Sequence, residues 1–299
     1  MQSVVFGFVC HMIVEIASVF WGVVAMASWG SSDFLVKRII GPLGYYRVLL
    51  YTQLISLPPL FLLAVVFPPP LPSSVRTVGL ITAIGVCYFL ALFTLYKGLA
   101  VGKVSIITPV ASTWAVVSMV LSFVFLGETL GLSQMFCTIL ILAGILMVSL
   151  RSSSGGQSNV GIFYALGCMF FSGLNAILLK LVSVDIGEIG TVFYSRLVVT
   201  VILLMVIPLF KSFRRDQRHK SSLKTIAGAG LSDFIGHVGF VVGVGVGIVS
   251  IVTPISGASP AVAVVLAQVF LKEKLLPIQK MAVALVILGI VLLSFVSMS

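Results

Sequence analysis

The chain has 299 residues, of which 60% are hydrophobic and only 9% are charged, and its mean hydropathy is +1.24. Soluble domains carry roughly 25% charged residues, so this composition excludes an ordinary soluble protein and indicates an all-α polytopic membrane protein in a lipid bilayer. A formal net charge of +10 would favour a nucleic-acid partner for a soluble protein. Here Lys and Arg stand in short loops between apolar runs, where they orient helices in the membrane, and we expect no nucleic-acid partner.

Apolar segments long enough to cross a bilayer follow one another along the whole chain. A hydrocarbon core of about 30 Å needs about 20 apolar residues per helix. Ten spans result when the sequence is divided at charges, proline clusters and Gly/Ser runs: 17–37, 46–67, 77–97, 104–126, 132–150, 159–181, 189–210, 224–245, 248–271 and 277–297. Residues 151–158 are rich in Ser and Gly, which predicts a flexible linker between a first unit at 17–150 and a second at 159–297.

The two units carry the same sequence pattern. Residues 104–149 and 249–294 align without a gap, and 18 of the 46 positions are identical. Shared hydrophobicity alone would not align Pro, Glu and Gly together. The informative identical pairs are Ser105 with Ser250, Pro109 with Pro254, Glu128 with Glu273, and Gly144 with Gly289.

The earlier parts of the two units also correspond. WGSSDFLVK at 29–37 resembles FSGLNAILLK at 171–180, which pairs Lys37 with Lys180. Each repeat therefore contains five spans, and an odd number places the two copies in opposite orientations in the membrane. The sequence predicts two inverted five-helix repeats around a central cavity, an arrangement found in many transporters.

Basic residues predict which side of the membrane each loop occupies. The loops on one side hold 15 of the 18 Lys and Arg residues when their flanks are counted. The positive-inside rule then places the basic 211–224 loop in the cytoplasm and both termini outside.

Several short motifs recur in a characteristic order: Trp29-Gly30-Ser31-Ser32, Thr108-Pro109, Leu126-Gly127-Glu128-Thr129-Leu130, Thr253-Pro254 and Leu271-Lys272-Glu273-Lys274-Leu275. In this order and spacing the chain resembles the EamA family of the drug/metabolite transporter superfamily over nearly its whole length. The resemblance implies a secondary transporter in the cell membrane, and an exporter of amino acids or other small metabolites from a cavity between the halves. Two features depart from the family pattern: the second motif has Lys272 where Gly is usual, and family members are commonly drawn with cytoplasmic termini.

Charged residues inside a membrane are costly and indicate function. Asp33 lies late in the first span, four residues before Lys37, so it either lines a cavity, where it takes up a proton or a cationic group, or forms an ion pair with Lys37 at the helix end. Asp233 and His237 lie four apart in LSDFIGHVGF. An Asp that holds the imidazole by a hydrogen bond would make a protonation switch, and the alternative is a buried pair that fixes helix packing.

Other polar and aromatic residues complete the expected substrate site, namely Trp29, Ser32, Trp114 and Asn175. Pro109 and Pro254 fall near the starts of two spans, where Pro is tolerated in a first turn or breaks the helix to free carbonyls. Glu128 and Glu273 close two spans, and we expect them to cap or pin the turn that follows. Arg47 and Arg196 are equivalent residues that begin two spans, and we interpret them as interfacial anchors in preference to anion-binding residues.

These patterns favour a carrier that works by alternating access, driven by a proton gradient or by the gradient of the solute itself. A lipid flippase and a channel remain as alternatives. An intramembrane enzyme acting on a lipid-linked substrate would need clustered carboxylates or a His-rich metal site, which the scattered acids and histidines do not provide. We expect no enzyme activity, no metal and no cofactor, and the glycine-rich face at 236–247 is compatible with packing within one chain or between two copies in a homodimer.

Overall fold

The computed structural model describes residues 2–101, 107, 110–149, 159–206, 223–271 and 277–296, and every regular element in those ranges is an α-helix. Helices satisfy all backbone N–H and C=O groups within one segment, which a bilayer core requires. The helices are α1 (Gln2–Leu43), α2 (Tyr45–Val66), α3 (Val75–Val101), α5 (Trp114–Phe125), α6 (Leu132–Ser149), α7 (Asn159–Val206), α9 (Leu223–Val246), α10 (Val249–Gly257), α11 (Ser259–Leu271) and α12 (Pro277–Val296).

Six helical stretches in the described residues have the length and hydropathy needed to cross a membrane: Val14–Gly41, Tyr45–Val66, Val75–Gly98, Val160–Val206, Leu223–Val246 and Val249–Phe270. Three shorter apolar helices cover Val110–Phe125, Leu132–Met147 and Lys280–Leu293. The helical membrane protein predicted from composition is therefore confirmed. The predicted linker at 151–158 and nearly all of the basic 211–224 loop lie outside the described residues.

Helix α7 replaces two of the predicted spans. Its 48 residues are interrupted at Gly187, where φ is 72° and ψ is 170°. A positive φ of this kind is readily adopted by glycine, which has no Cβ to clash with the backbone. At 1.5 Å per residue the apolar stretch Val160–Val206 measures about 70 Å, more than twice a hydrocarbon core of about 30 Å. Helix α7 is thus long enough for two crossings, one on each side of Gly187.

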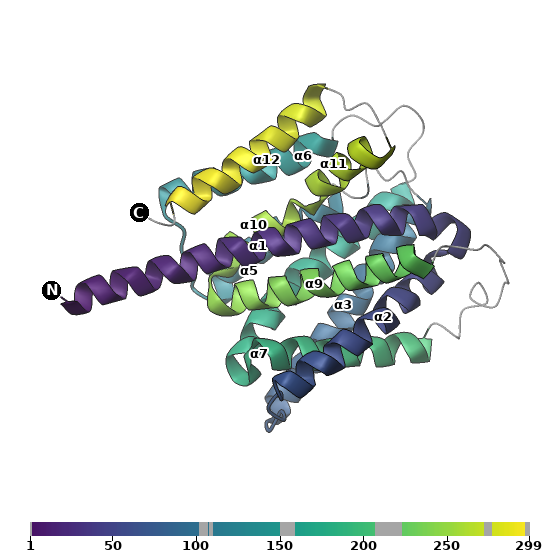
Figure 1. Ribbon diagram of the computed structural model, residues 1–299, viewed down its shortest axis with the longest axis horizontal. Coiled ribbons are helices and arrows are strands. Elements are labelled where there is room, and N and C mark those ends of the chain that lie inside the picture. The colour runs from purple at the N-terminus through teal and green to yellow at the C-terminus, as the bar shows by residue number, and fades with distance from the viewer. Residues whose placement is uncertain are drawn as a thin grey trace.

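Helix α1 lies side by side with α9 (Figure 1). A Cβ placed on Gly236 of α9 would lie 2.5 Å from Cδ1 of Trp29, and one placed on Gly239 would lie 3.3 Å from the carbonyl oxygen of Trp21. Small residues allow helices to approach this closely in a membrane. These positions of the glycine-rich face at 236–247 therefore pack within one chain.

Two other close helix contacts come in matched pairs. A Cβ on Gly144 of α6 would lie 2.7 Å from Val286 of α12, and a Cβ on Gly289 of α12 would lie 2.7 Å from Ile141 of α6. In the sequence repeat Gly144 corresponds to Gly289 and Ile141 to Val286. A second matched pair joins α1 to α11 and α7 to α5. Gly30 packs against Val262, and the equivalent Gly173 packs against Val117, the equivalent of Val262.

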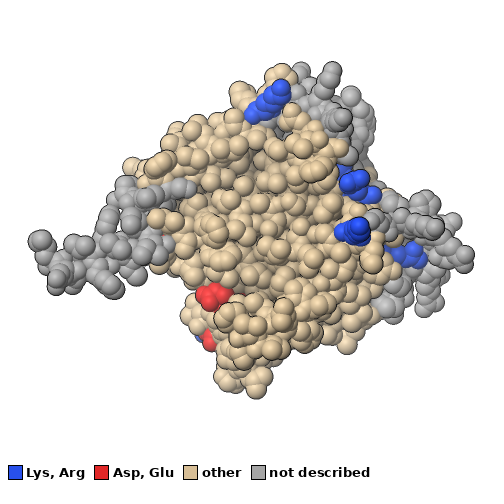
Figure 2. Space-filling view, viewed as in Figure 1, with Lys and Arg blue, Asp and Glu red and all other residues tan. Residues whose placement is uncertain are grey.

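Charges separate toward opposite ends of the face drawn in Figure 2, where Lys and Arg lie mainly toward the end at which α1 runs into α2 and the acidic residues lie toward the other end. The start of α1 and the end of α12 both lie at the end away from the α1–α2 turn (Figure 1). This separation agrees with the distribution of basic loops along the sequence.

Candidate functional site

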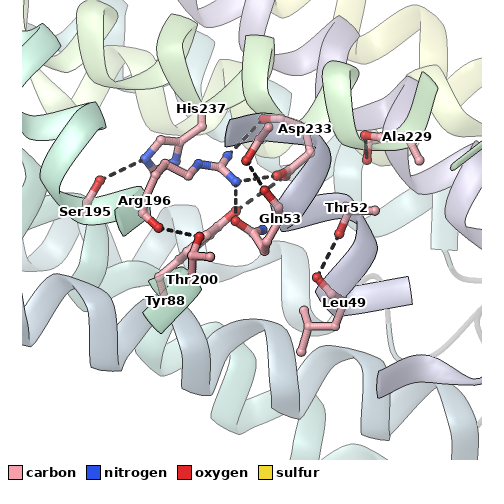
Figure 3. Close-up of polar contacts among 12 residues, drawn as sticks. Leu49, Thr52, Gln53, Tyr88, Ser195, Arg196, Thr200, Ala229, Asp233 and His237 are labelled. Carbon is pink, nitrogen blue, oxygen red and sulfur yellow. Dashed lines mark hydrogen bonds and ion pairs between the residues drawn. The ribbon is translucent and has the colours of Figure 1, made fainter. Parts of the chain in front are cut away.

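A buried salt bridge joins the second half of α7 to the middle of α9. The side chain of Arg196 is completely buried. Its Nη1 donates to Oδ2 of Asp233 at 2.7 Å and to Oε1 of Gln53 at 2.8 Å, and its Nη2 donates to the carbonyl oxygen of Asp233 at 3.2 Å (Figure 3). Burying a guanidinium costs several kcal/mol unless it is paired and hydrogen-bonded. The contacts to α2 and α9 supply that compensation for Nη1 and Nη2, whereas Nε has no hydrogen-bond partner among the described residues.

Tyr88 of α3 covers the same salt bridge. The guanidinium carbon of Arg196 lies 5.2 Å from the centre of the Tyr88 ring, within the range of a cation–π interaction. The Tyr88 hydroxyl donates to Oδ1 of Asp233 at 3.4 Å. Helices α2, α3, α7 and α9 thus meet at one ion pair.

This placement corrects the interpretation of Arg196 as an interfacial anchor. Arg196 lies seven residues inside the span predicted at 189–210, and its side chain is completely enclosed by protein and paired with Asp233. Its depth in that span was the available signal, because a charge at such depth indicates a partner. The identity of the partner, Asp233, was not visible in the sequence.

His237 lies one helical turn after Asp233 on α9 and is also buried. Its Nε2 is 3.4 Å from the hydroxyl of Ser195, the residue before Arg196, and its ring centre is 5.3 Å from that of Tyr88. The two side chains of α9 therefore approach neighbouring residues of α7. Their hydrogen bonds go to Ser195, Arg196 and Tyr88, where the sequence had suggested a bond between Asp233 and His237.

Asp33 lies on α1 and is exposed. The neighbouring Ser32 donates to the carbonyl oxygen of Ala229, one turn before Asp233 on α9, so Asp33 stands at about the level of the Arg196–Asp233 pair. The suggested ion pair with Lys37 is not formed in the described part of the chain, where Arg196 and Asp233 make the salt bridge.

Three aromatic rings from different helices gather close to this region. Trp29 of α1, Trp114 of α5 and Phe240 of α9 have ring centres 5.4 to 6.3 Å apart, and we call them the aromatic trio. Trp29 and Trp114 are half-buried, whereas Phe240 is buried. Trp29 stands four residues before Asp33, which places both side chains on one face of α1.

Two further predicted residues also have defined positions. The hydroxyl of Ser32 donates to the carbonyl oxygen of Ala229 at 3.0 Å and ties α1 to α9. Asn175 is buried on α7, and its Oδ1 has no hydrogen-bond partner among the described residues. It follows Gly173, which packs against the carbonyl of Trp114.

Charged side chains hold both helix ends at the junction between α9 and α10. Nζ of Lys180 donates to the carbonyl oxygens of Gly245 and Gly247 at 3.1 and 2.8 Å. The Glu128 carboxylate accepts the backbone N–H groups of Val249 and Ser250, both at 2.9 Å, and the Ser250 hydroxyl at 2.7 Å. A cation at a helix C-terminus and an anion at a helix N-terminus both interact favourably with the helix dipole.

Glu128 therefore caps a helix of the second unit, more than 120 residues away, where the sequence had suggested the adjacent turn. Pro254 lies inside α10, which ends three residues later at Gly257. Pro109 and Glu273 lie outside the described residues. Among the residues that the structure does describe, His, Cys, Asp and Glu form no group of three or more that could hold a metal ion.

Known proteins match this chain in both sequence and fold. One relative, an uncharacterized protein of Methanocaldococcus jannaschii, is 41% identical over 58 residues, which span 19% of this chain and 42% of that protein. A solved crystal structure shares the fold with a TM-score of 0.74 and 15% sequence identity, over 94% of this chain and 97% of the other. The sequence pattern of the EamA-like transporter family matches residues 16–150 and 159–295. The chain belongs to the EamA-like transporter family.

Proposed function

We propose that this protein is a secondary transporter that moves a small organic solute across the cell membrane by alternating access. The observation that carries the proposal is the position of the ion pair. Gln53 and Tyr88 from the first unit meet Arg196 and Asp233 from the second, near the middle of apolar helices. A charge pair at this depth is expensive, and its location between the two units is where a solute would pass in a carrier built from repeats.

The reciprocal glycine contacts support a pair of inverted five-helix repeats as the framework for this movement. When residue i of one unit contacts residue j of the other and the equivalent residues exchange the contact, the units are related by a two-fold axis. Gly144 with Val286 and Gly289 with Ile141 follow this rule. The length of α7, sufficient for two crossings, supports a total of ten spans.

We further propose that the basic 211–224 loop faces the cytoplasm and that the solute is a small metabolite, exported with the help of a proton gradient. The excess of Lys and Arg on one set of loops supports the orientation. Asp33 and His237, two titratable side chains close to the Arg196–Asp233 pair, support proton coupling.

Transport by proteoliposomes with an imposed proton gradient tests the proposal. The full-length chain would be reconstituted and offered a pooled metabolite mixture, with uptake identified by mass spectrometry. We expect a solute whose uptake saturates and which is lost in Asp233→Asn. The matched control is Asp185→Asn, because Asp185 is an exposed carboxylate two residues before the break in α7 at Gly187, and it accepts a hydrogen bond from Thr77. Unchanged flux in folded Asp233→Asn would refute the assignment of this site. If no solute in the mixture showed saturable uptake by the wild-type protein, the transport function itself would be refuted.

A further inference from the structure

We propose that the transported solute is an aromatic amine without a carboxylate, bound by Asp33 through its ammonium group and by the aromatic trio through its ring. The inference rests on the transport function proposed above and names the solute class of that site. It follows from the charges available in the site and from the spacing of the residues on α1.

Asp33 is the carboxylate of this region that lacks a cationic partner in the described part of the chain. Asp233 is neutralised by Arg196, whereas the exposed Asp33, which α1 holds at about the level of Asp233 through the bond of Ser32 to Ala229, has no such partner. Arg196 carries one positive charge and the two aspartates carry two negative charges, so one negative charge is left uncompensated. An uncompensated carboxylate between apolar helices is stabilised by an incoming cation.

The same charges disfavour a solute that carries a carboxylate. Arg196 is fully buried; Asp233 and Gln53 accept hydrogen bonds from its Nη atoms, and the face of Tyr88 covers the guanidinium. Its Nε has no hydrogen-bond partner among the described residues, but it is buried with the rest of the side chain. Lys180 donates to the carbonyl groups at the α9–α10 junction. The carboxylate of an amino acid would thus find no free cation among these groups and would be repelled by Asp33, whereas the corresponding amine avoids both costs.

The aromatic trio determines what the rest of the solute looks like. Trp29 precedes Asp33 by four residues, which is one helical turn or about 6 Å along α1. A ring joined to an ammonium group by a two-carbon linker spans this distance. Its ring would meet the half-buried faces of Trp29 and Trp114, where offset or edge-to-face contacts between aromatic rings are favourable.

Binding of three matched ligands tests this inference. Radiolabelled phenethylamine, phenylalanine and 2-phenylethanol share a ring and differ only in the carboxylate or the ammonium group. The full-length chain in lipid nanodiscs would be titrated with each. We expect saturable binding of phenethylamine, with phenylalanine and 2-phenylethanol each weaker by about tenfold or more, since the loss of one partly buried ion pair is of that order.

Substitutions of Asp33 test whether phenethylamine binds at this residue. Asp33→Asn should weaken phenethylamine binding by about tenfold or more, Asp33→Glu should retain most of it, and Asp185→Asn should leave it unchanged. Phenylalanine or 2-phenylethanol binding as tightly as phenethylamine would overturn the inference on the wild-type protein alone, even if Asp33→Asn fails to fold. Folded Asp33→Asn that binds phenethylamine like wild type would also overturn it.

Flux measured in parallel separates this inference from the transport proposal. Saturable phenethylamine binding without flux of any solute would refute transport but retain the amine site. Flux of other solutes without phenethylamine binding or competition would refute the amine site but retain transport.

Discussion

Removing the carboxylate of Asp233 is expected to destabilise the folded protein strongly, because it leaves the buried guanidinium of Arg196 without its anion. The Asp233→Leu variant would forfeit the 2.7 Å contact of Nη1 and the acceptor of the Tyr88 hydroxyl. Breaking a buried ion pair from one side costs about 3–5 kcal/mol. Gln53 and the Asp233 backbone carbonyl would remain as acceptors, so we expect the lower part of this range, about 3 kcal/mol.

The double variant Arg196→Met/Asp233→Leu gives the contrasting expectation. With both charges removed, no uncompensated ion is buried, and apolar replacement of a buried pair is commonly neutral or stabilising. We therefore expect the double variant to recover most of the free energy of unfolding lost by Asp233→Leu. Such a recovery would show that the single-variant cost arises from the orphaned guanidinium and not from the altered shape of the side chain.

The assay is reversible unfolding in mixed micelles, followed by circular dichroism. Wild type, Asp233→Leu, Arg196→Met and the double variant form a double-mutant cycle and are measured under the same conditions. Asp185→Asn serves as the control, with an expected change below about 1 kcal/mol because this exposed side chain makes a single modest hydrogen bond. The reasoning is refuted if Asp233→Leu unfolds within about 1 kcal/mol of wild type, or if the double variant is less stable than the single one.

Three further predictions concern close helix contacts and the cap of α10. Gly236→Val would bring its Cβ within 2.5 Å of the α1 tryptophan ring and should lower the free energy of unfolding by about 1–3 kcal/mol, whereas Gly79→Val meets no atom within 4 Å and should cost less than 1.5 kcal/mol. Gly144→Ala and Gly289→Ala make matched contacts, each with a side-chain carbon at 2.7 Å, and micelle unfolding should show losses within about 1 kcal/mol of one another. Glu128→Gln loses the charge of the α10 cap and should speed amide hydrogen exchange in α10 by about tenfold; unchanged exchange would contradict the capping contact.

Much of the candidate site was accessible from the sequence because intramembrane charge is rare. That rarity singles out Asp33, Asp233 and His237; in the structure Asp233 pairs with Arg196, and His237 lies one turn later on α9 beside Ser195. The interpretation of Arg196 as an interfacial anchor is wrong, because its equivalence to Arg47 near the start of α2 does not reflect its deeper, buried position in α7. The capping of α10 by Glu128 was also not predicted, because a glutamate at the end of a span usually caps the adjacent turn.

The sequence by itself determined the class of fold and the resemblance between the two units. Hydrophobicity over about 20 residues suffices for a membrane helix, and the alignment of Pro, Glu and Gly at matched positions reveals the repeat. Which side chains meet was decided only by the tertiary structure. Arg196 pairs with Asp233 and Gln53 because the packing of α2, α7 and α9 brings together residues up to 143 positions apart. Helix periodicity fixes the face on which a charge lies, but only the packed arrangement of helices fixes the partner that neutralises it.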